Sequence, residues 1–230
     1  MNDFFANSYF MGIFLTLALF QLGRIVHKFL PWPIFHPMLV GMAILVAILA
    51  TTDLTTEAYF ASSRYLMLFM TPTTVCLAVP LYQEIQQLRR HWRGVAAGII
   101  TGVFLNLAGV YVFARLLGFE HAVYVSFIPK SVSTAIGMGL TAEMGGHVSI
   151  TMVLICINGM FGNLCGPWVC KLCGIREPVA KGVAMGTASH AFGTIKALDL
   201  GRVEGAMSGL SIALTGILTV AGAAFVSSLI

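Results

Sequence analysis

The sequence predicts an all-α protein, a polytopic membrane helix bundle with two discontinuous or re-entrant elements in an inverted repeat. Three observations predict this fold: a shortage of charged residues, a series of eight apolar segments, and polar interruptions in two of those segments. The chain has 230 residues, of which 58% are hydrophobic and 10% are charged, and its mean hydropathy is +0.89. A soluble domain carries about 25% charged residues, so lipid must cover most of this surface.

The length is consistent with a single membrane domain that covers residues 1–230. A span needs roughly 20 apolar residues, so the apolar segments use most of the chain and leave no room for a soluble catalytic domain. The sequence has no HExxH motif, nucleophile elbow or phosphate-binding loop, and we expect no enzymatic activity and no organic cofactor. Histidine and cysteine show no metal-ligand spacing. The net charge of +4 is scattered over short loops, which does not indicate a nucleic-acid partner.

The apolar segments are predicted in the order in which they occur along the chain. They are Phe5–Gly23, Ile34–Ala50, Tyr65–Tyr82, Gly94–Gly118, Ala122–Ala142, Val148–Val169, Gly182–Leu198 and Gly205–Ile230. The first is predicted to be a span and not a removed signal peptide, because no positive region precedes it and no small-x-small cleavage site follows it.

The segment Ala122–Ala142 is interrupted at Pro129 and Lys130, within the string FIPKSVSTAIGMG. Proline breaks the helical hydrogen-bond ladder, and a lysine at mid-membrane is energetically costly. The segment Gly182–Leu198 is short, rich in small residues and holds several hydroxyl groups and His190. Irregular backbone at this depth is tolerated only against protein or a wet cavity, so neither segment is expected to face lipid.

Loop charges favour a topology in which these two segments enter the membrane and return. Arg24 and Lys28 form one basic loop, Arg89–Arg93 a second, and Lys171–Lys181 a third. If all eight segments crossed, the third basic loop would lie outside, against the positive-inside rule. With two re-entrant segments, all three basic loops lie in the cytoplasm and both termini face the periplasm. The alternative is a set of ordinary spans with one exception to the rule.

The re-entrant topology implies an internal repeat. A re-entrant element followed by a span occurs at 122–170 and again at 182–229, in opposite orientations. Inverted repeats with broken helices near the midplane are typical of secondary transporters. Glycines spaced four apart, Gly94, Gly98 and Gly102, allow helices to approach closely. They are expected either in the core or at a dimer interface.

The polar residues of the interrupted segments are the candidate substrate site. These candidates are Lys130, Ser131, Ser133, Thr134, Asn158, Thr187, Ser189, His190 and Thr194. A lysine beside hydroxyls and freed backbone N–H groups is suited to a carboxylate. Alternatively, Lys130 reaches the interface, fixes a helix end, or pairs with Glu143, Asp199 or Glu204 from another segment.

His190 is the candidate proton carrier, because histidine titrates near neutral pH; the coupling ion is expected to be H⁺ or Na⁺. The alternative for the segment around Thr187 and His190 is a polar helix face hydrogen-bonded to its neighbours. Asn158 and Asn163 are expected to face the interior, since an unpaired amide is costly in lipid. Both are also compatible with a purely structural role.

Several strings resemble the LrgB/CidB family of membrane proteins. They are PKSVSTAIGMG at 129–139, KGVAMGTASHAFGT at 181–194, EGAMSGLSIALTG at 204–216 and VPLYQEIQQLRRHWRG at 79–94. The resemblance covers nearly the whole chain and extends to the C-terminal half of the plastidial glycolate/glycerate translocator. It implies a bacterial inner-membrane protein with one of two functions.

The first implied function is secondary transport of small monocarboxylates or hydroxycarboxylates of the glycolate, glycerate, lactate or pyruvate class. The second is holin/antiholin-like control of murein hydrolase activity and autolysis, together with a small membrane partner of the LrgA/CidA type. Buried polar motifs favour transport, because a self-assembling hole does not need them. Membrane lipid, a small carboxylate and a second copy of the chain, most simply in a dimer, are the other expected partners.

Overall fold

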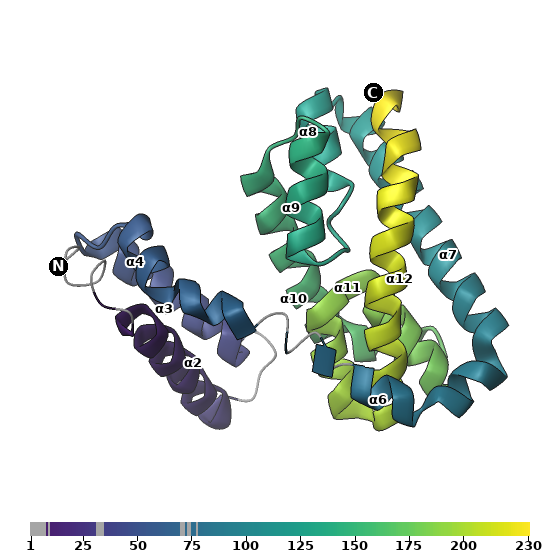
Figure 1. The fold of residues 1–230 in the computed structure, drawn as a ribbon, viewed down its shortest axis with the longest axis horizontal. Helices are drawn as coiled ribbons and strands as arrows, with labels where there is room; N and C mark the ends of the chain where they lie inside the picture. The colour runs from purple at the N-terminus through teal and green to yellow at the C-terminus, as the bar shows by residue number, and fades with distance from the viewer. Residues whose placement is uncertain (1–7, 9, 31–34, 70–71, 73–74, 77) are drawn as a thin grey trace. The chain divides into compact units, whose positions relative to one another are not determined.

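The computed structural model describes residues 8, 10–30, 35–69, 72, 75–76 and 78–230. It divides into two compact units, Met1–Cys76 and Leu77–Ile230, which are described separately. The part of the chain that is described is helical and contains no strand, as the sequence predicts. Figure 1 shows the helices of both units.

The longer helical elements among the described residues of the first unit are three α-helices and a 3-10 helix. They are α2 (Met11–Phe29), α3 (Pro37–Thr51), α4 (Thr56–Ser63) and η2 (Arg64–Phe69). Helices α2 and α3 pack closely, because a side chain at Gly23 would meet the backbone of Pro37. The hydroxyl groups of Thr16 and Tyr59 lie 2.7 Å apart and connect α2 to α4.

The second unit contains the longer helices and both interrupted segments. Its elements are α6 (Ala78–Gln83), α7 (Ile85–Leu117), α8 (His121–Phe127), α9 (Thr134–Glu143), α10 (Val148–Leu172), α11 (Pro178–Leu200), α12 (Arg202–Val226) and η3 (Ser227–Leu229). Helix α7 begins nine residues before the apolar segment predicted at Gly94. The residues that precede the apolar segment include glutamine, leucine and arginine, which are good helix formers and extend the helix beyond it.

Helices α8 and α9 form a hairpin around the predicted break. Residues 128–133, which we call the first tip, are turns and bends between the two helices. After α9 the chain returns beside α8, because the backbone N–H of His147 donates to Ser126 Oγ over 2.8 Å. Thr151 Oγ1, on α10, also donates to the carbonyl oxygen of Ser126. The chain after α9 therefore returns to the level of Ser126, in the last turn of α8.

Helix α11 is a second hairpin, although its helical assignment runs continuously. Ser189 and His190, which we call the second tip, have non-helical backbone angles, with φ −134° and 41° respectively. The first half of α11 packs on α12, since a side chain at Gly186 would meet the backbone of Ser208. The second half returns to the end where α11 began, because Leu198 packs against Gly205 near the start of α12.

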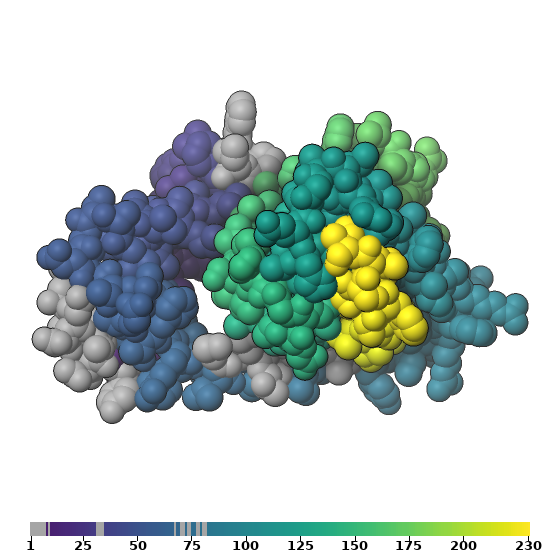
Figure 2. Space-filling model, turned by 90° about the horizontal axis from the view of Figure 1, so that it is seen from above, coloured from purple at the N-terminus to yellow at the C-terminus, as the bar shows by residue number. Residues whose placement is uncertain are grey.

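The two hairpins open toward opposite ends of the second unit. At the α8 end, His121 Nδ1 lies 2.7 Å from the carbonyl oxygen of Ile230, and the yellow C-terminus lies between teal and green segments in Figure 2. At the other end, Arg202 donates to Gln83 Oε1 over 2.7 Å. The predicted discontinuous elements are confirmed as interrupted helices. The inverted repeat of 122–170 and 182–229 stays a prediction, as does the single domain.

Four of the described helices are long and apolar enough to cross a membrane. These spans are Met11–Phe29, Ile85–Leu117, Val148–Leu172 and Arg202–Leu229, and α3 is a shorter apolar helix of 15 residues. They correspond to four of the predicted spans. The first residues of the predicted span Phe5–Gly23 and the middle of Tyr65–Tyr82 lie outside the described residues, so the latter span stays a prediction.

The basic loops of the second unit lie at one end, opposite its C-terminus. Gln83, shortly before α7, accepts a hydrogen bond from Arg202 at the start of α12. His91, near the start of α7, lines the same cavity as Glu177, which directly precedes α11. The loop between α10 and α11 is therefore at the α7 N-terminal end. This grouping agrees with the charge-based topology; the side of the membrane on which it lies stays a prediction.

The hydrophobic core of the second unit lies between α7, α8, α11 and α12. On α7 the buried residues follow one face, with Val95, Ile99, Val103 and Leu107 each four residues apart. The opposite face of α7 is exposed and apolar, with Phe104 67% exposed. An exposed apolar helix face of this kind is suited to lipid.

Candidate functional site

Lys130 lies in the first tip and contacts an asparagine from α7. Its Nζ donates a hydrogen bond to Asn106 Oδ1, and Ser131 Oγ donates to the same oxygen over 3.4 Å. Asn106 Nδ2 in turn donates to the carbonyl oxygen of Ile128 over 3.4 Å. The Asn106 side chain therefore holds the broken backbone of the first tip on both sides of Pro129.

Lys130 has no acidic partner within the described part of the chain. The ion pair found there joins Lys196 Nζ to Asp199 Oδ2 over 3.5 Å. Glu143, Asp199 and Glu204, the alternative partners considered from the sequence, make no ion pair with Lys130. An ammonium in an apolar setting is costly without a compensating charge, so the position is suited to an external anion.

A cavity of about 710 Å³, which we call the central cavity, lies between α7, the first tip, α10 and the first half of α11. It is lined by Ala97, Gly98, Thr101, Gly102, Leu105, Asn106, Lys130, Ser131, Asn158, Val183, Ala184, Thr187 and Ala188. Small-molecule pockets usually enclose about 300–1,000 Å³, so the space is sufficient for a small carboxylate. Four of the nine predicted site residues line it.

Asn158 on α10 connects the first tip to the residue directly before the second tip. Its Nδ2 atom donates to the carbonyl oxygen of Lys130 over 3.2 Å and to that of Ala188 over 2.7 Å. Ser131 Oγ lies 3.4 Å from the same nitrogen. The sequence predicted that Asn158 faces the interior. In the structure it lies between Lys130, 28 residues earlier in the chain, and Ala188, 30 residues later.

Thr187 and Ser189 lie on different sides of the second tip. Thr187 lines the central cavity, although its Oγ1 atom is buried and has no hydrogen-bond partner among the described residues. Ser189 lines a separate cavity of about 250 Å³ together with Asn158, Ala184 and Ala188, which also line the central cavity. The two cavities therefore adjoin along Ala184, Ala188 and Asn158.

His190 and Thr194 lie away from the central cavity. His190 Nε2 is 3.1 Å from the carbonyl oxygen of Ile155 on α10, and the residue is 2% exposed. Thr194 Oγ1 donates to the carbonyl oxygen of His190 over 3.0 Å and lies 2.7 Å from Ser208 Oγ. These contacts match the alternative of a polar helix face bonded to its neighbours; the proton role of His190 stays a prediction.

Ser133 and Thr134 lie at the start of α9 and do not line the central cavity. Ser133 is the residue before the first turn, and its carbonyl oxygen accepts from the N–H of Gly137 over 2.9 Å. Both side chains are half-buried. Of the three hydroxyl residues predicted beside Lys130, Ser131 alone reaches the cavity.

Sequence reasoning missed Asn106 and Thr101, which line the central cavity from α7. Asn106 stands in the middle of the apolar segment Gly94–Gly118. A lone amide at that depth needs a partner, which is the signal that identified Asn158. The partner of Asn106 is 24 residues away in sequence, and the sequence does not specify that contact.

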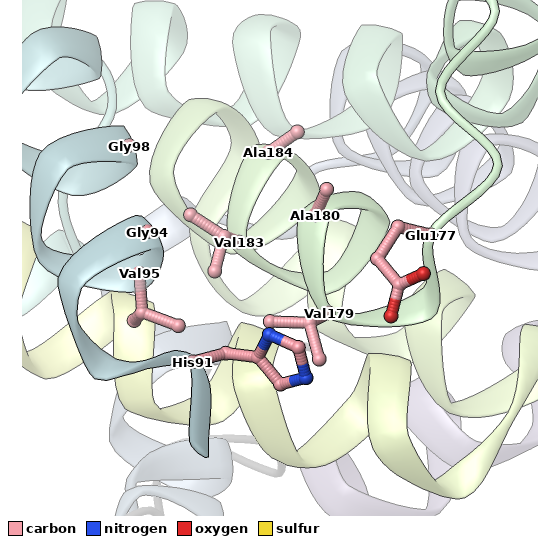
Figure 3. Close-up of a pocket in the computed structure, with 9 residues that line it drawn as sticks. All are labelled: His91, Gly94, Val95, Gly98, Glu177, Val179, Ala180, Val183 and Ala184. Atoms are coloured by element: carbon pink, nitrogen blue, oxygen red, sulfur yellow. The ribbon is translucent and has the colours of Figure 1, made fainter. Parts of the chain in front are cut away.

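A further hollow of about 310 Å³ extends the central cavity toward the N-terminal end of α7. Figure 3 shows its lining between α7 and α11, with His91 and Glu177 at one end and Gly98 and Ala184 at the other. Gly98, Val183 and Ala184 line both spaces. The two hollows therefore adjoin.

The glycines of α7 pack against α11 within the chain. A Cβ atom at Gly98 would lie 3.2 Å from Val183 Cγ1, and one at Gly102 would lie 2.7 Å from Thr187 Cγ2. Gly94 has open space beside it and lines the hollow of Figure 3. Of the two roles considered for this stripe, packing in the core applies to Gly98 and Gly102.

The described residues contain no cluster of three or more His, Cys, Asp or Glu side chains that could hold a metal ion. The polar groups of the site are instead one ammonium, two amides and hydroxyls. These groups bind anions and neutral polar molecules through hydrogen bonds.

Comparison with known proteins identifies the family. Residues 16–229 match the family model described as the LrgB-like family. "Antiholin-like protein LrgB" of Bacillus mycoides (strain KBAB4) is 29% identical over 212 residues, which are 92% of each chain. The proteins of the same name from Bacillus cereus (strain B4264) and Bacillus anthracis (strain CDC 684 / NRRL 3495) are 28% identical over the same length. No solved structure matches the chain. The chain is a multi-pass bacterial membrane protein and belongs to the LrgB-like family.

Proposed function

We propose that the protein is a secondary transporter of small monocarboxylates or hydroxycarboxylates, of the glycolate, glycerate, lactate or pyruvate class. One observation carries the proposal: Lys130, a cation without an acidic partner in the described chain, lines a cavity where two helical hairpins from opposite ends meet. Broken helices that meet at a polar site are typical of secondary transporters. Either H⁺ or Na⁺ is proposed as the coupling ion.

The chemistry of the central cavity favours a carboxylate. Lys130 Nζ supplies a charged donor, and Asn106, Asn158 and Ser131 supply amide and hydroxyl groups. Hydrogen bonds to charged groups contribute about 1.5–3 kcal/mol, which is more than neutral ones do. A bound carboxylate would compensate the Lys130 charge, and the hydroxyl group of a hydroxycarboxylate would find a partner in an amide.

The names of the relatives favour a second candidate function. Both the Bacillus mycoides and the Bacillus cereus proteins are called antiholin-like, and that name supports control of autolysis more directly than it supports transport. Under this proposal the chain acts with a small LrgA/CidA-type membrane protein and modulates murein hydrolase activity. A modulator of this kind does not require a substrate at Lys130.

Uptake into proteoliposomes tests the two candidates. If the chain is a carrier, ¹⁴C-glycolate uptake saturates, is reduced by unlabelled lactate or pyruvate, and depends on an imposed H⁺ or Na⁺ gradient. Carboxyfluorescein, a larger anion, stays inside the same vesicles. Release of carboxyfluorescein without saturable glycolate uptake would contradict the carrier and support the second candidate. Reconstitution with and without an LrgA-type protein shows whether that partner is required.

A further inference from the structure

A second group of cations lines a cavity at the loop between α10 and α11. Lys171, Arg176 and Lys181 surround a space of about 500 Å³, whose lining contains no aspartate or glutamate. Lys181 is half-buried, whereas Lys171 and Arg176 are exposed. Over the described residues, none of the three has a carboxylate within ion-pair distance. Three uncompensated positive charges therefore face one hollow.

This basic hollow adjoins the cavity beside the second tip. Cys170 and Ile175 line both the basic hollow and the cavity of about 250 Å³ that contains Ser189. Asn158 and Ala188, at the far side of that smaller cavity, also line the central cavity with Lys130. Three adjoining spaces thus follow the groove between α10 and α11 from the loop to Lys130.

The groove is lined by small residues where the two helices approach. A Cβ atom at Gly166 would lie 3.2 Å from Met185 Cε, and one at Gly162 would collide with Ser189. Both glycines line the smaller cavity. Larger side chains at these positions would fill the connection between the basic hollow and the tips.

Membrane topology alone does not account for the basic hollow. Basic residues at one end of the spans satisfy the positive-inside rule wherever they stand on that end. Arg89 and Arg90 lie at the same end of the unit, are exposed and line none of the four cavities described. The positive-inside rule therefore does not explain why Lys171, Arg176 and Lys181 line one hollow.

We propose that Lys171, Arg176 and Lys181 form an anion-binding vestibule, which holds a small carboxylate at the loop end of the groove that leads to Lys130. This inference rests on the proposed transport function and adds a second, peripheral binding site to it. Clefts lined by one sign of charge raise the local concentration of counter-ions by about 10-fold or more. The vestibule would therefore increase occupancy of the groove at low substrate concentration.

A thiol-reactivity measurement tests the vestibule without requiring transport. Ile175→Cys is introduced into a chain whose five native cysteines are replaced, and the purified protein is reconstituted. The rates of modification by an anionic and a cationic methanethiosulfonate reagent are then compared. With the native cations the anionic reagent reacts faster, and Lys171→Gln with Arg176→Gln lowers the anionic-to-cationic ratio by about tenfold. Glycolate slows the modification of Cys at position 175.

The matched control removes two charges from the same end but outside the vestibule. Arg89→Gln with Arg90→Gln leaves the rate ratio at position 175 unchanged. An equal fall of the ratio in both double variants, or no fall in either, overturns the vestibule. The measurement is repeated in phosphatidylcholine vesicles with and without phosphatidylglycerol. An effect that appears only with phosphatidylglycerol assigns the cations to lipid headgroups and also overturns the proposal.

Uptake kinetics separate this inference from the transport proposal. In proteoliposomes at about 0.01 M ionic strength, the Lys171→Gln/Arg176→Gln variant has a KM for glycolate about tenfold above that of the unmodified protein. At about 1 M the two values converge, because the Debye length falls to about 3 Å. Absence of saturable uptake by the unmodified protein contradicts transport, and the thiol experiment then decides on the vestibule. Saturable uptake with the same KM in both proteins contradicts the vestibule alone.

Discussion

The side chain of Asn158 donates a hydrogen bond of 2.7 Å to the carbonyl oxygen of Ala188, directly before the second tip. The same nitrogen donates to the carbonyl oxygen of Lys130 in the first tip. One amide on α10 therefore holds both interrupted segments. A change in the distance between the tips would change the contacts of Asn158.

Asn158→Leu is expected to lower both stability and substrate affinity. The leucine side chain branches at the same carbon atom as asparagine but leaves the carbonyl oxygens of Lys130 and Ala188 without this donor. A buried polar group without a partner costs about 1–3 kcal/mol, so we expect a lower melting temperature in detergent. We also expect a rise of about tenfold in the KM for glycolate, because about 1.4 kcal/mol is a factor of ten in affinity.

Asn163→Leu is the matched control on the same helix. Asn163 Nδ2 donates to the carbonyl oxygen of Phe192 over 2.8 Å. Asn163 lines neither the central cavity nor the cavity beside Ser189. Its variant is expected to lose stability to a similar degree and to keep the KM. If the two variants raise the KM equally, the effect of Asn158 is structural only.

The sequence predicted the two interruptions because their signals are local. Pro129 and Lys130 disrupt an apolar run, and a cytoplasmic loop at Lys171–Lys181 requires an odd number of crossings between the periplasmic N-terminus and that loop. The hairpins of the first and second tips agree with both signals. The grouping of the two basic loops of the second unit at one end could be predicted for the same reason, since loop charges are read directly from the sequence.

The contacts of the site could not be predicted, because they join distant segments. Lys130 meets Asn106 across 24 residues, and Asn158 meets Ala188 across 30 residues. The direction of the His190 side chain depends on its backbone angles, φ 41° and ψ −131°, and these arise from the turn as a whole. Chemistry alone suggested His190 for the site, whereas the turn directs its ring toward Ile155.

Gly186→Ala is expected to destabilise the packing of α11 on α12. A Cβ atom there would lie 2.8 Å from Ser208 Cα and closer still to its carbonyl oxygen. Backbone atoms cannot move as a flexible side chain can, so overpacking should cost about 1–3 kcal/mol. The loss is measured as a lower melting temperature by fluorescence-detected size exclusion.

Gly109→Ala provides the comparison for this substitution, because Gly109 is helical and has open space around the added carbon. An alanine in a helix is favoured over glycine by about 0.5–1 kcal/mol. We expect the Gly109→Ala variant to be at least as stable as the unmodified protein. Equal stability of the Gly186→Ala and Gly109→Ala variants would show that α11 and α12 do not approach closely at Gly186.

His190→Gln is expected to remove the dependence of uptake on a pH gradient, while glycolate still binds, if His190 carries the coupling proton. The backbone at His190 has a positive φ, which is uncommon for residues other than glycine. His190→Gly is therefore tested as well, since it removes the ring and tolerates the turn. Uptake is measured with and without an inward proton gradient, and glycolate binding is measured separately by equilibrium dialysis.

The two His190 variants separate chemistry from backbone strain. Loss of proton dependence in both supports a role for the ring. Preserved proton dependence in the glycine variant excludes His190 as the carrier and indicates that the glutamine acts through the turn. Thr194→Val, which removes the hydroxyl bonded to the His190 carbonyl, is expected to keep proton dependence.

Lys130→Ala is expected to weaken glycolate binding by tenfold or more. Lys130 Nζ is a charged donor that lines the central cavity, and its removal eliminates a charge-assisted hydrogen bond of about 1.5–3 kcal/mol. A factor of ten corresponds to about 1.4 kcal/mol. Lys130→Arg is also expected to bind more weakly, because a planar guanidinium fork replaces a compact ammonium beside Asn106.

Lys196→Ala is the matched control, since Lys196 is a lysine of the same unit that pairs with Asp199 outside the central cavity. Its variant should insert, elute as a single species and bind glycolate with unchanged affinity.

Asn106→Leu addresses the position of Lys130: it removes the acceptor of the ammonium without removing the charge. If Lys130 binds substrate, this variant keeps part of the affinity that Lys130→Ala loses. A Lys130→Ala protein that inserts normally and binds glycolate as tightly as the unmodified chain would remove Lys130 from the site. A protein that fails to insert while Asn106→Leu inserts and binds would indicate that the charge itself is needed for folding.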